Sequence, residues 1–70
     1  MSVKDIFRLN LRKLRFQQKL TQMAVADLID IDRNRYAYWE HGKSEPSLTM
    51  LAALAKALNI SVDDLLTKEQ

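Results

Sequence analysis

The chain has 70 residues, of which 47% are hydrophobic, with one glycine, one proline and no cysteine. This composition predicts a single folded domain, residues 1–70, and excludes disulfides and thiolate metal sites. His41 is the one histidine and the carboxylates are scattered, so we expect no metal and no cofactor. No apolar run could span a bilayer and the N-terminus lacks a signal-peptide pattern, which predicts a cytoplasmic protein without membrane contact.

The formal net charge is +2, but it is unevenly distributed. Residues 1–20 carry six basic groups and one acidic group, whereas residues 21–70 carry five basic and eight acidic groups. A basic end on a small domain suits a polyanionic partner. Charge alone favours the alternative, which is an ordinary solvated helix face.

The first helix is predicted over residues 4–19, which contain no helix breaker. Its core-facing residues recur at helical spacing: Phe7, Leu11 and Leu14. A second apolar row lies on the opposite side of the same helix: Ile6, Leu9 and Phe16. One helix of a small domain seldom buries both faces in its own core. We therefore expect either the chain end or another molecule to cover the second row.

The second helix is predicted over residues 22–29, with Thr21 as its N-cap. Ala26 is expected where two helices approach each other closely. A larger side chain at this position would push the two helices apart. Asp30 is expected in the left-handed conformation that ends this helix, since Asp and Asn tolerate that conformation.

The third helix is predicted from the Asp32 cap to about His41, where Gly42 supplies the usual helix stop. Two aromatic residues of this helix, Tyr36 and Trp39, are expected in the core. The faces that its core residues leave open carry a different set: Arg33, Asn34, Arg35, Ala37 and Tyr38.

The fourth helix begins after the cap residue Ser47 and has the apolar spacing of a core-facing helix. Its stripe consists of Leu48, Leu51, Leu54, Ala55 and Leu58. Asn59 is a candidate left-handed cap, and Ser61 with Asp64 forms a variant capping box that opens a last helix through about Leu66. Five helices without a strand predict an all-α bundle, whose helices are too short to be stable without packing.

Several short motifs occur together along the chain: LRKLR at 11–15, LTQ at 20–22, Ala26, WEHGK at 39–43, PSL at 46–48 and LAALAKALNISVDDLL at 51–66. In these motifs residues 11–66 resemble the Cro and phage-repressor type of helix-turn-helix protein, also called the XRE family. The resemblance implies a five-helix bundle of the lambda-repressor-like DNA-binding domain type, with its helix-turn-helix motif at about residues 21–41. It also implies duplex DNA as the partner, often bound by dimers on palindromic operators.

The resemblance makes the third helix the recognition helix, which lies in the major groove with its N-terminal part against base edges. The guanidinium of Arg33 suits guanine O6 and N7, and the amide of Asn34 suits adenine N6 and N7. Tyr38 lies one turn beyond Asn34 and is placed to reach a base or a phosphate, while Ala37 is small enough to approach a thymine methyl group. The alternative is that Arg33 and Asn34 are solvated first-turn residues, which would be the preferred interpretation outside this motif.

Three further residues are candidates for contacts with the DNA backbone. In the family, a glutamine at the position of Gln22 binds a phosphate at the start of the second helix. Lys43, just after the third helix, is a second candidate for a contact with the DNA backbone. Arg35 is either a third anchor or a solvated charge. Such contacts position the protein without specifying sequence and make binding sensitive to salt.

Arg15 and Glu40 are assigned to structure, because the resemblance implies a buried salt bridge between the first and third helices. Asp30 and Asp32 depart from the family, where Gly and Ser or Thr are common at these positions. They place two carboxylates beside the expected DNA-facing helix, and an N-cap carboxylate favours the helix but disfavours a nearby phosphate. Apolar Leu28 also departs from the family and extends a candidate association surface: Ile6, Leu9, Phe16 and Leu28.

The function expected from these features is sequence-specific binding of duplex DNA by a homodimeric transcriptional regulator, a repressor that covers a promoter site. Only four residues follow residue 66, so no small-molecule effector is expected. One alternative is an antitoxin or a restriction-system controller with an added protein partner. Another is a protein-interaction module that keeps the fold without binding DNA. An enzyme is not expected, because no nucleophile accompanies the histidine and no glycine-rich phosphate loop is present.

Overall fold

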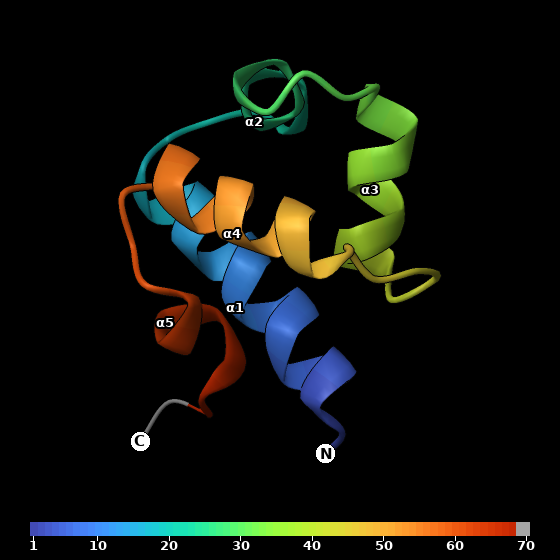
Figure 1. Cartoon of the computed structure of the whole chain (residues 1–70), viewed down its shortest axis with the longest axis vertical. Helices are drawn as coiled ribbons and strands as arrows, with labels where there is room; N and C mark the ends of the chain where they lie inside the picture. Colours follow the sequence, from blue (N-terminus) through green and yellow to red (C-terminus); the bar gives the residue numbers. More distant parts are fainter. Residues whose placement is uncertain (69–70) are drawn as a thin grey trace.

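The computed structural model describes residues 1–68, which fold into a bundle of five helices with no strand in that part of the chain (Figure 1). In chain order the helices are α1 (Val3–Gln17), α2 (Gln22–Leu28), α3 (Arg33–His41), α4 (Leu48–Ala57) and α5 (Val62–Leu66). The predicted all-α architecture and the order of its elements are confirmed. None of these helices combines the length and the apolar character that a membrane span requires, within the described residues.

Every helix begins at a side chain that caps its backbone. The cap residues accept a hydrogen bond from a backbone N–H two or three residues further on: Ser2, Thr21, Asp32, Ser47 and Ser61. At α5 the reciprocal bond is also present, because the Asp64 carboxylate accepts from the Ser61 N–H at 3.0 Å. The four predicted caps and the capping box are therefore confirmed, and Ser2 is an additional cap that starts α1 one residue earlier than expected.

Within residues 1–68, four residues have a positive φ and end or redirect the chain between helices: Lys19 at 58°, Asp30 at 57°, Gly42 at 75° and Asn59 at 56°. Asp30 and Asn59 adopt the left-handed conformation that the sequence predicted. The left-handed conformation of Lys19 was not predicted. The first helix was expected to run to residue 19, but it ends at Gln17. At Gly42 a side chain would be strained by the φ angle, and its Cβ would lie 3.0 Å from the Arg8 Cδ.

The core forms where α1, α3, α4 and the short α2 and α5 meet. Its largest fully buried side chains are Trp39, Tyr36, Leu11, Leu54, Leu58, Leu65 and Val25. The Tyr36 and Trp39 rings meet edge to face with centroids 6.0 Å apart. Leu48 is a correction to the predicted stripe, because its side chain is 86% exposed. It is the first residue of α4, and the packed part of this helix begins only at Met50.

Helix α3 contacts both α1 and α2, and it forms one outer edge of the bundle (Figure 1). Helix α5 packs against α1 and α4 at the end of the bundle away from α2. The fold therefore uses α1 as a central scaffold, with the recognition helix expected from the sequence on one side and the C-terminal helix on the other.

Asn10 fastens α5 to α1 through a contact that the sequence did not indicate. Its Nδ2 donates to three backbone oxygens at the end of α5, those of Asp64 at 3.2 Å, Leu65 at 3.2 Å and Thr67 at 2.9 Å. The last carbonyl groups of a helix have no partners within that helix. The Asn10 amide therefore acts as a C-terminal cap supplied by another helix.

Replacing Asn10 with Ala should lower the free energy of unfolding by about 0.5–1.5 kcal/mol, because it removes the donor of these exposed or partly buried carbonyl groups. For a domain of this size each kcal/mol lowers the melting temperature by roughly 4–8 °C. Asn10→Asp should cost more, because a carboxylate would face carbonyl oxygens. Thermal unfolding followed by circular dichroism measures both, with Gln17→Ala on the same helix as the control. Equal melting temperatures for Asn10→Ala and the wild type would contradict the assigned role.

Candidate nucleic-acid interface

The outer face of α3 carries the polar side chains that the sequence assigned to DNA. Arg33, Asn34, Arg35 and Tyr38 are all exposed, with Tyr38 at 49%. Ala37 is not part of this face. Only 7% of its surface is exposed, and it belongs with Tyr36, Trp39 and Glu40 to the buried side of the helix. This burial speaks against the predicted approach of Ala37 to a thymine methyl group.

Arg33 is ordered by two neighbours in the first turn of α3. Its Nη1 donates to the Gln22 Oε1 at 3.3 Å and its Nη2 to the Asn34 Oδ1 at 3.1 Å. The Asp32 carboxylate accepts from the Asn34 backbone N–H at 3.1 Å, which is its predicted cap interaction. The turn between α2 and α3 thus brings together an arginine and two amides beside the start of α3.

Two of the predicted backbone-contacting residues lie on or directly after α3. The Lys43 Nζ lies 5.5 Å from the centroid of the Tyr38 ring, within the range of a cation–π interaction. This contact places a positive charge beside Tyr38, and Arg35 is exposed on the same helix. Cationic groups therefore occur at both ends of α3, and cationic side chains are common contacts of DNA phosphates.

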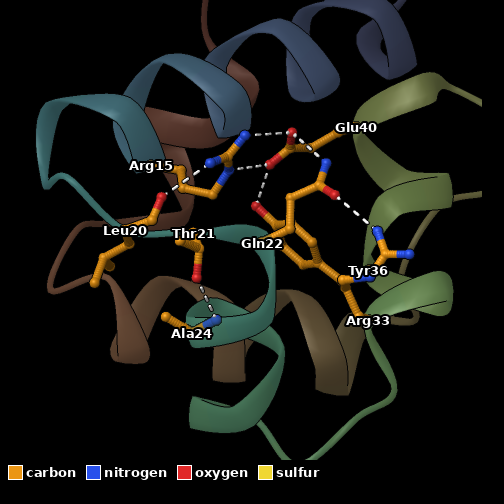
Figure 2. A network of polar contacts seen from close by, with 8 residues as sticks. All are labelled: Arg15, Leu20, Thr21, Gln22, Ala24, Arg33, Tyr36 and Glu40. Atoms are coloured by element: carbon orange, nitrogen blue, oxygen red, sulfur yellow. Dashed lines mark hydrogen bonds and ion pairs between the residues drawn. The ribbon is translucent and has the colours of Figure 1, made fainter.

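Behind α3, the predicted ion pair between Arg15 and Glu40 is present and buried (Figure 2). The Arg15 Nε donates to the Glu40 Oε2 at 2.6 Å and its Nη2 to the Oε1 at 3.0 Å, which is a bidentate arrangement. The third nitrogen, Nη1, donates to the Leu20 carbonyl at 2.9 Å. One guanidinium therefore links α1, the loop between α1 and α2, and the last turn of α3.

Two more donors complete the surroundings of the Glu40 carboxylate. The Tyr36 hydroxyl donates to its Oε2, and the Gln22 Nε2 donates to its Oε1 at 3.1 Å. With the two bonds from Arg15, each carboxylate oxygen accepts two hydrogen bonds. No buried side-chain nitrogen or oxygen in the described residues lacks a partner. The network is fully satisfied, which is the condition under which a buried charge is tolerated.

The network shifts the pKa values of its members. Burial by itself raises the pKa of Glu40, but hydrogen bonds from Arg15, Tyr36 and Gln22 and the charge of Arg15 outweigh it, so the pKa is lowered. The hydrogen bond to Glu40 raises the pKa of Arg15. Burial, followed by the hydrogen bond to Glu40, raises the pKa of Tyr36. At neutral pH the pair is therefore ionised and Tyr36 is a neutral donor.

Gln22 was expected to bind a DNA phosphate, and the structure gives its side chain a further role. Its amide lies between Glu40 and Arg33, with Nε2 toward the carboxylate and Oε1 toward the guanidinium (Figure 2). One N–H of this amide is not used by the Glu40 bond and remains suited to a phosphate. The link between Gln22 and Arg33 could not be predicted from the sequence, because it depends on how α2 and α3 are turned toward each other.

The candidate association surface is only partly exposed. Leu9 at 39%, Phe16 at 58% and Leu28 at 57% are open to solvent, whereas Ile6 is half-buried. The Phe16 ring also has a partner within the chain, because the Arg15 guanidinium carbon lies 4.6 Å from its centroid. Phe16 thus covers one side of the Arg15 guanidinium.

Among residues 1–68, no group of three or more His, Cys, Asp or Glu side chains is arranged to hold a metal ion. The exposed face of α3 carries the guanidinium groups of Arg33 and Arg35, the amide of Asn34 and the hydroxyl of Tyr38.

The Glu40 carboxylate should make stability depend on pH. Its pKa in the folded state is below the ordinary value, so its contribution is complete above that value and is lost as pH falls through the lowered pKa. Urea unfolding of the wild type between about pH 7 and pH 3 should show this loss. Glu40→Gln removes the titrating group and should flatten the decline, although it costs about 3–5 kcal/mol at neutral pH.

The control for this measurement is Asp5→Asn, which removes an exposed carboxyl whose pKa is lowered chiefly by its hydrogen bond with Arg8. This variant should retain most of the decline. If Glu40→Gln is partly unfolded in buffer alone, sulfate restores the folded state so that the profiles can be compared. Parallel profiles for the wild type and Glu40→Gln would show that Glu40 is not the linked group.

Comparison with known proteins agrees with this geometry. The helix-turn-helix family model matches residues 11–65. YqaE, an HTH-type transcriptional regulator of Bacillus subtilis (strain 168), is 41% identical over 64 residues, which are 91% of this chain and 55% of YqaE. Control protein C.SmaI of Serratia marcescens is 35% identical over 69 residues, or 99% of this chain and 82% of that protein.

A similar solved structure is that of the restriction-modification controller protein C.AhdI from Aeromonas hydrophila, with a TM-score of 0.84 and 34% identity over 89% of this chain and 94% of that one. The chain spans about half the length of YqaE. The family match covers α2, the turn and α3 together with the scaffold that holds them. The chain belongs to the helix-turn-helix family, of the XRE or Cro and phage-repressor type.

Proposed function

We propose that this protein is a transcriptional regulator that binds duplex DNA by sequence, with α3 lying in the major groove. The observation that carries the proposal is the division of α3 into two sides. Tyr36, Trp39 and Glu40 lock one side to the bundle, and the other side presents exposed Arg33, Asn34 and Tyr38. A short rigid helix with outward-facing donors has the form and chemistry that a major groove accepts.

Roles for the individual side chains follow from their positions. Arg33 and Asn34 lie in the first turn, where recognition helices contact base edges, and Tyr38 lies one turn further along the same face. Lys43 and Arg35 supply positive charge for phosphates. The negative charge of the Asp32 carboxylate is partly balanced by the start of α3. The carboxylate accepts a hydrogen bond from the α3 backbone, and the N-terminus of a helix carries a partial positive charge.

The mode of action that we propose is a homodimer on an inverted repeat, which represses by covering a promoter site. A two-fold symmetric pair of recognition helices reads half-sites about 10 base pairs apart on one side of the DNA. The exposed apolar side chains of Leu9, Phe16 and Leu28 support an association surface on this chain. The relation to regulators such as YqaE supports a role in transcription.

A second candidate is control of a restriction–modification system, which is favoured by two specific similarities. C.SmaI is named a control protein and C.AhdI a restriction-modification controller protein, and the chain covers 82% and 94% of them. DNA binding is common to both candidates. A restriction endonuclease gene beside the gene of this protein would favour the controller, and a toxin gene would favour an antitoxin.

Selection of bound sequences from random duplex DNA tests the proposal directly. The expected result is an enriched inverted repeat whose two arms are separated by about one helical turn, roughly 10 base pairs. An enriched site without two-fold symmetry would contradict the proposed homodimer. Recovery of no preferred sequence, together with binding that is insensitive to salt, would instead favour a protein-interaction module.

Substitutions on α3 should separate base contacts from phosphate contacts. Arg33→Ala and Asn34→Ala should each lower binding to the selected site, by about 1–3 kcal/mol for a lost bidentate contact, with little change in melting temperature because both side chains are exposed. Lys43→Ala should weaken binding to all sequences alike and reduce the salt slope by about 1. Fluorescence anisotropy at several salt concentrations measures these effects.

The matched control for Lys43→Ala is Lys56→Ala, which removes a lysine from the last turn of α4. It should leave both affinity and salt slope unchanged. If Arg33→Ala and Asn34→Ala keep the wild-type preference for the selected site, the assignment of base reading to the first turn of α3 is wrong.

A further inference from the structure

Helix α1 carries an excess of basic side chains that base reading by α3 does not account for. Arg8, Arg12 and Arg15 are spaced by four and three residues, which places them on one face of the helix. Arg15 is buried against Glu40 in the last turn of α3. The face that carries Arg8 and Arg12 is therefore the face of α1 that borders α3.

A second contact, made by Arg8, places the same face beside the end of α3. The Arg8 Cδ lies 3.0 Å from the position that a Cβ on Gly42 would occupy, so the arginine stem rests on the residue that ends α3. The next residue is Lys43, whose Nζ lies 5.5 Å from the centroid of the exposed Tyr38 ring. Positively charged side chains therefore continue from the end of α3, across Gly42, onto α1.

Arg12 is an exposed charge on this face, one helical turn beyond Arg8. No carboxylate in the described part of the chain lies within ion-pair distance of it. Its guanidinium carbon lies 5.8 Å from the centroid of the Phe16 ring, which also contacts the Arg15 guanidinium. An arginine that rests on an aromatic ring still has N–H groups for an acceptor. Arg12 is thus partly ordered by the chain, while its charge is not paired.

Two acidic side chains limit the extent of this positive surface. Asp5 accepts from the Arg8 Nε at 3.2 Å, and this bond leaves the four N–H groups of the two Nη atoms unused. Lys4 continues the spacing one turn before Arg8, but it lines a groove together with Glu45. The surface that carries the inference therefore consists of Lys43, Arg8 and Arg12, which we call the cationic track.

We propose that Arg8 and Arg12 continue the positive surface that begins at Lys43 and bind the phosphate backbone of the DNA that α3 reads. The inference rests on the proposed function, and it adds α1 to the elements that contact DNA. Four residues of helix span about 6 Å, and one strand of duplex DNA carries a charge every ~3.4 Å along its axis. Arg8 and Arg12 are therefore spaced to meet different phosphates of one strand.

The first test measures how affinity depends on salt, for the selected site and for a random duplex. Arg12→Gln should weaken binding to both sequences alike, because a phosphate contact carries no sequence information. Its salt slope should fall by about 0.9, so a fourfold rise in salt should cost roughly 3.5-fold less affinity than it costs the wild type. Arg12→Lys keeps the charge and should keep the slope.

The matched control is Lys13→Gln, which removes a positive charge from the next residue of the same helix. Lys13 lines the groove between α1 and α5 with Asp63 and Asp64, away from the cationic track. This variant should keep the wild-type slope. Melting temperatures show that each variant is folded under the conditions of the binding measurement.

The second test replaces the phosphates of the selected site one at a time with uncharged methylphosphonates. We expect one phosphate in each half-site at which the replacement weakens the wild type but not Arg12→Gln. It should differ from the phosphate that loses its effect in Lys43→Ala. Arg8→Gln should lose the effect of a phosphate between these two, because Arg8 lies between Lys43 and Arg12 on the protein.

Several results would overturn the inference while the preference of the wild type for its site remains intact. One is a wild-type salt slope and an unchanged phosphate pattern in Arg12→Gln, which would make this face of α1 an ordinary solvated surface. Another is an equal fall in slope for Lys13→Gln, which would reduce the effect to net charge. A loss in Arg12→Lys as large as in Arg12→Gln would assign the effect to packing on Phe16. A wild type that prefers no sequence would contradict the proposed function, and this inference with it.

Discussion

The rest of the structure depends on the buried ion pair between Arg15 and Glu40. A charged pair taken out of water is tolerated only when its remaining hydrogen-bonding groups are satisfied, and here Leu20, Tyr36 and Gln22 satisfy them. The pair therefore specifies an arrangement more than it adds stability. It fixes the last turn of α3 against α1 and also holds the start of α2. The buried side of α3 therefore determines the angle between the two helices of the motif.

Fixing α3 in this way decides which of its side chains meet solvent. Tyr36 and Trp39 anchor the buried side through packing, and the exposed side is left with donors and cations. The two acidic residues of the turn are accommodated by backbone roles: Asp30 takes a left-handed conformation and Asp32 caps α3. Asp30 thus stands where glycine would adopt the same φ without a side chain, and Asp32 supplies the cap of α3 with a carboxylate.

Sequence reasoning was most successful where local chemistry determines structure. Thr21, Ser47 and Ser61 mark helix starts because their hydroxyls satisfy backbone N–H groups, and the structure confirms them. It failed where the rotation and extent of a helix decide burial. Ala37 proved to be buried and Leu48 exposed, because the arc that α3 buries is wider than its aromatic residues indicate and the packed part of α4 begins only at Met50. The contacts of Asn10 and Gln22 join distant parts of the chain and leave no trace in local sequence.

The central claim is that α3 reads the major groove through Arg33, and the most direct measurement is a scan of the selected operator with 7-deazaguanine. This base lacks the N7 acceptor but pairs normally. The account predicts one position in each half-site where the replacement weakens wild-type binding, by up to about 1–3 kcal/mol for a full bidentate contact, and leaves Arg33→Ala unaffected. No sensitive guanine, or equal losses for the wild type and Arg33→Ala, would contradict it.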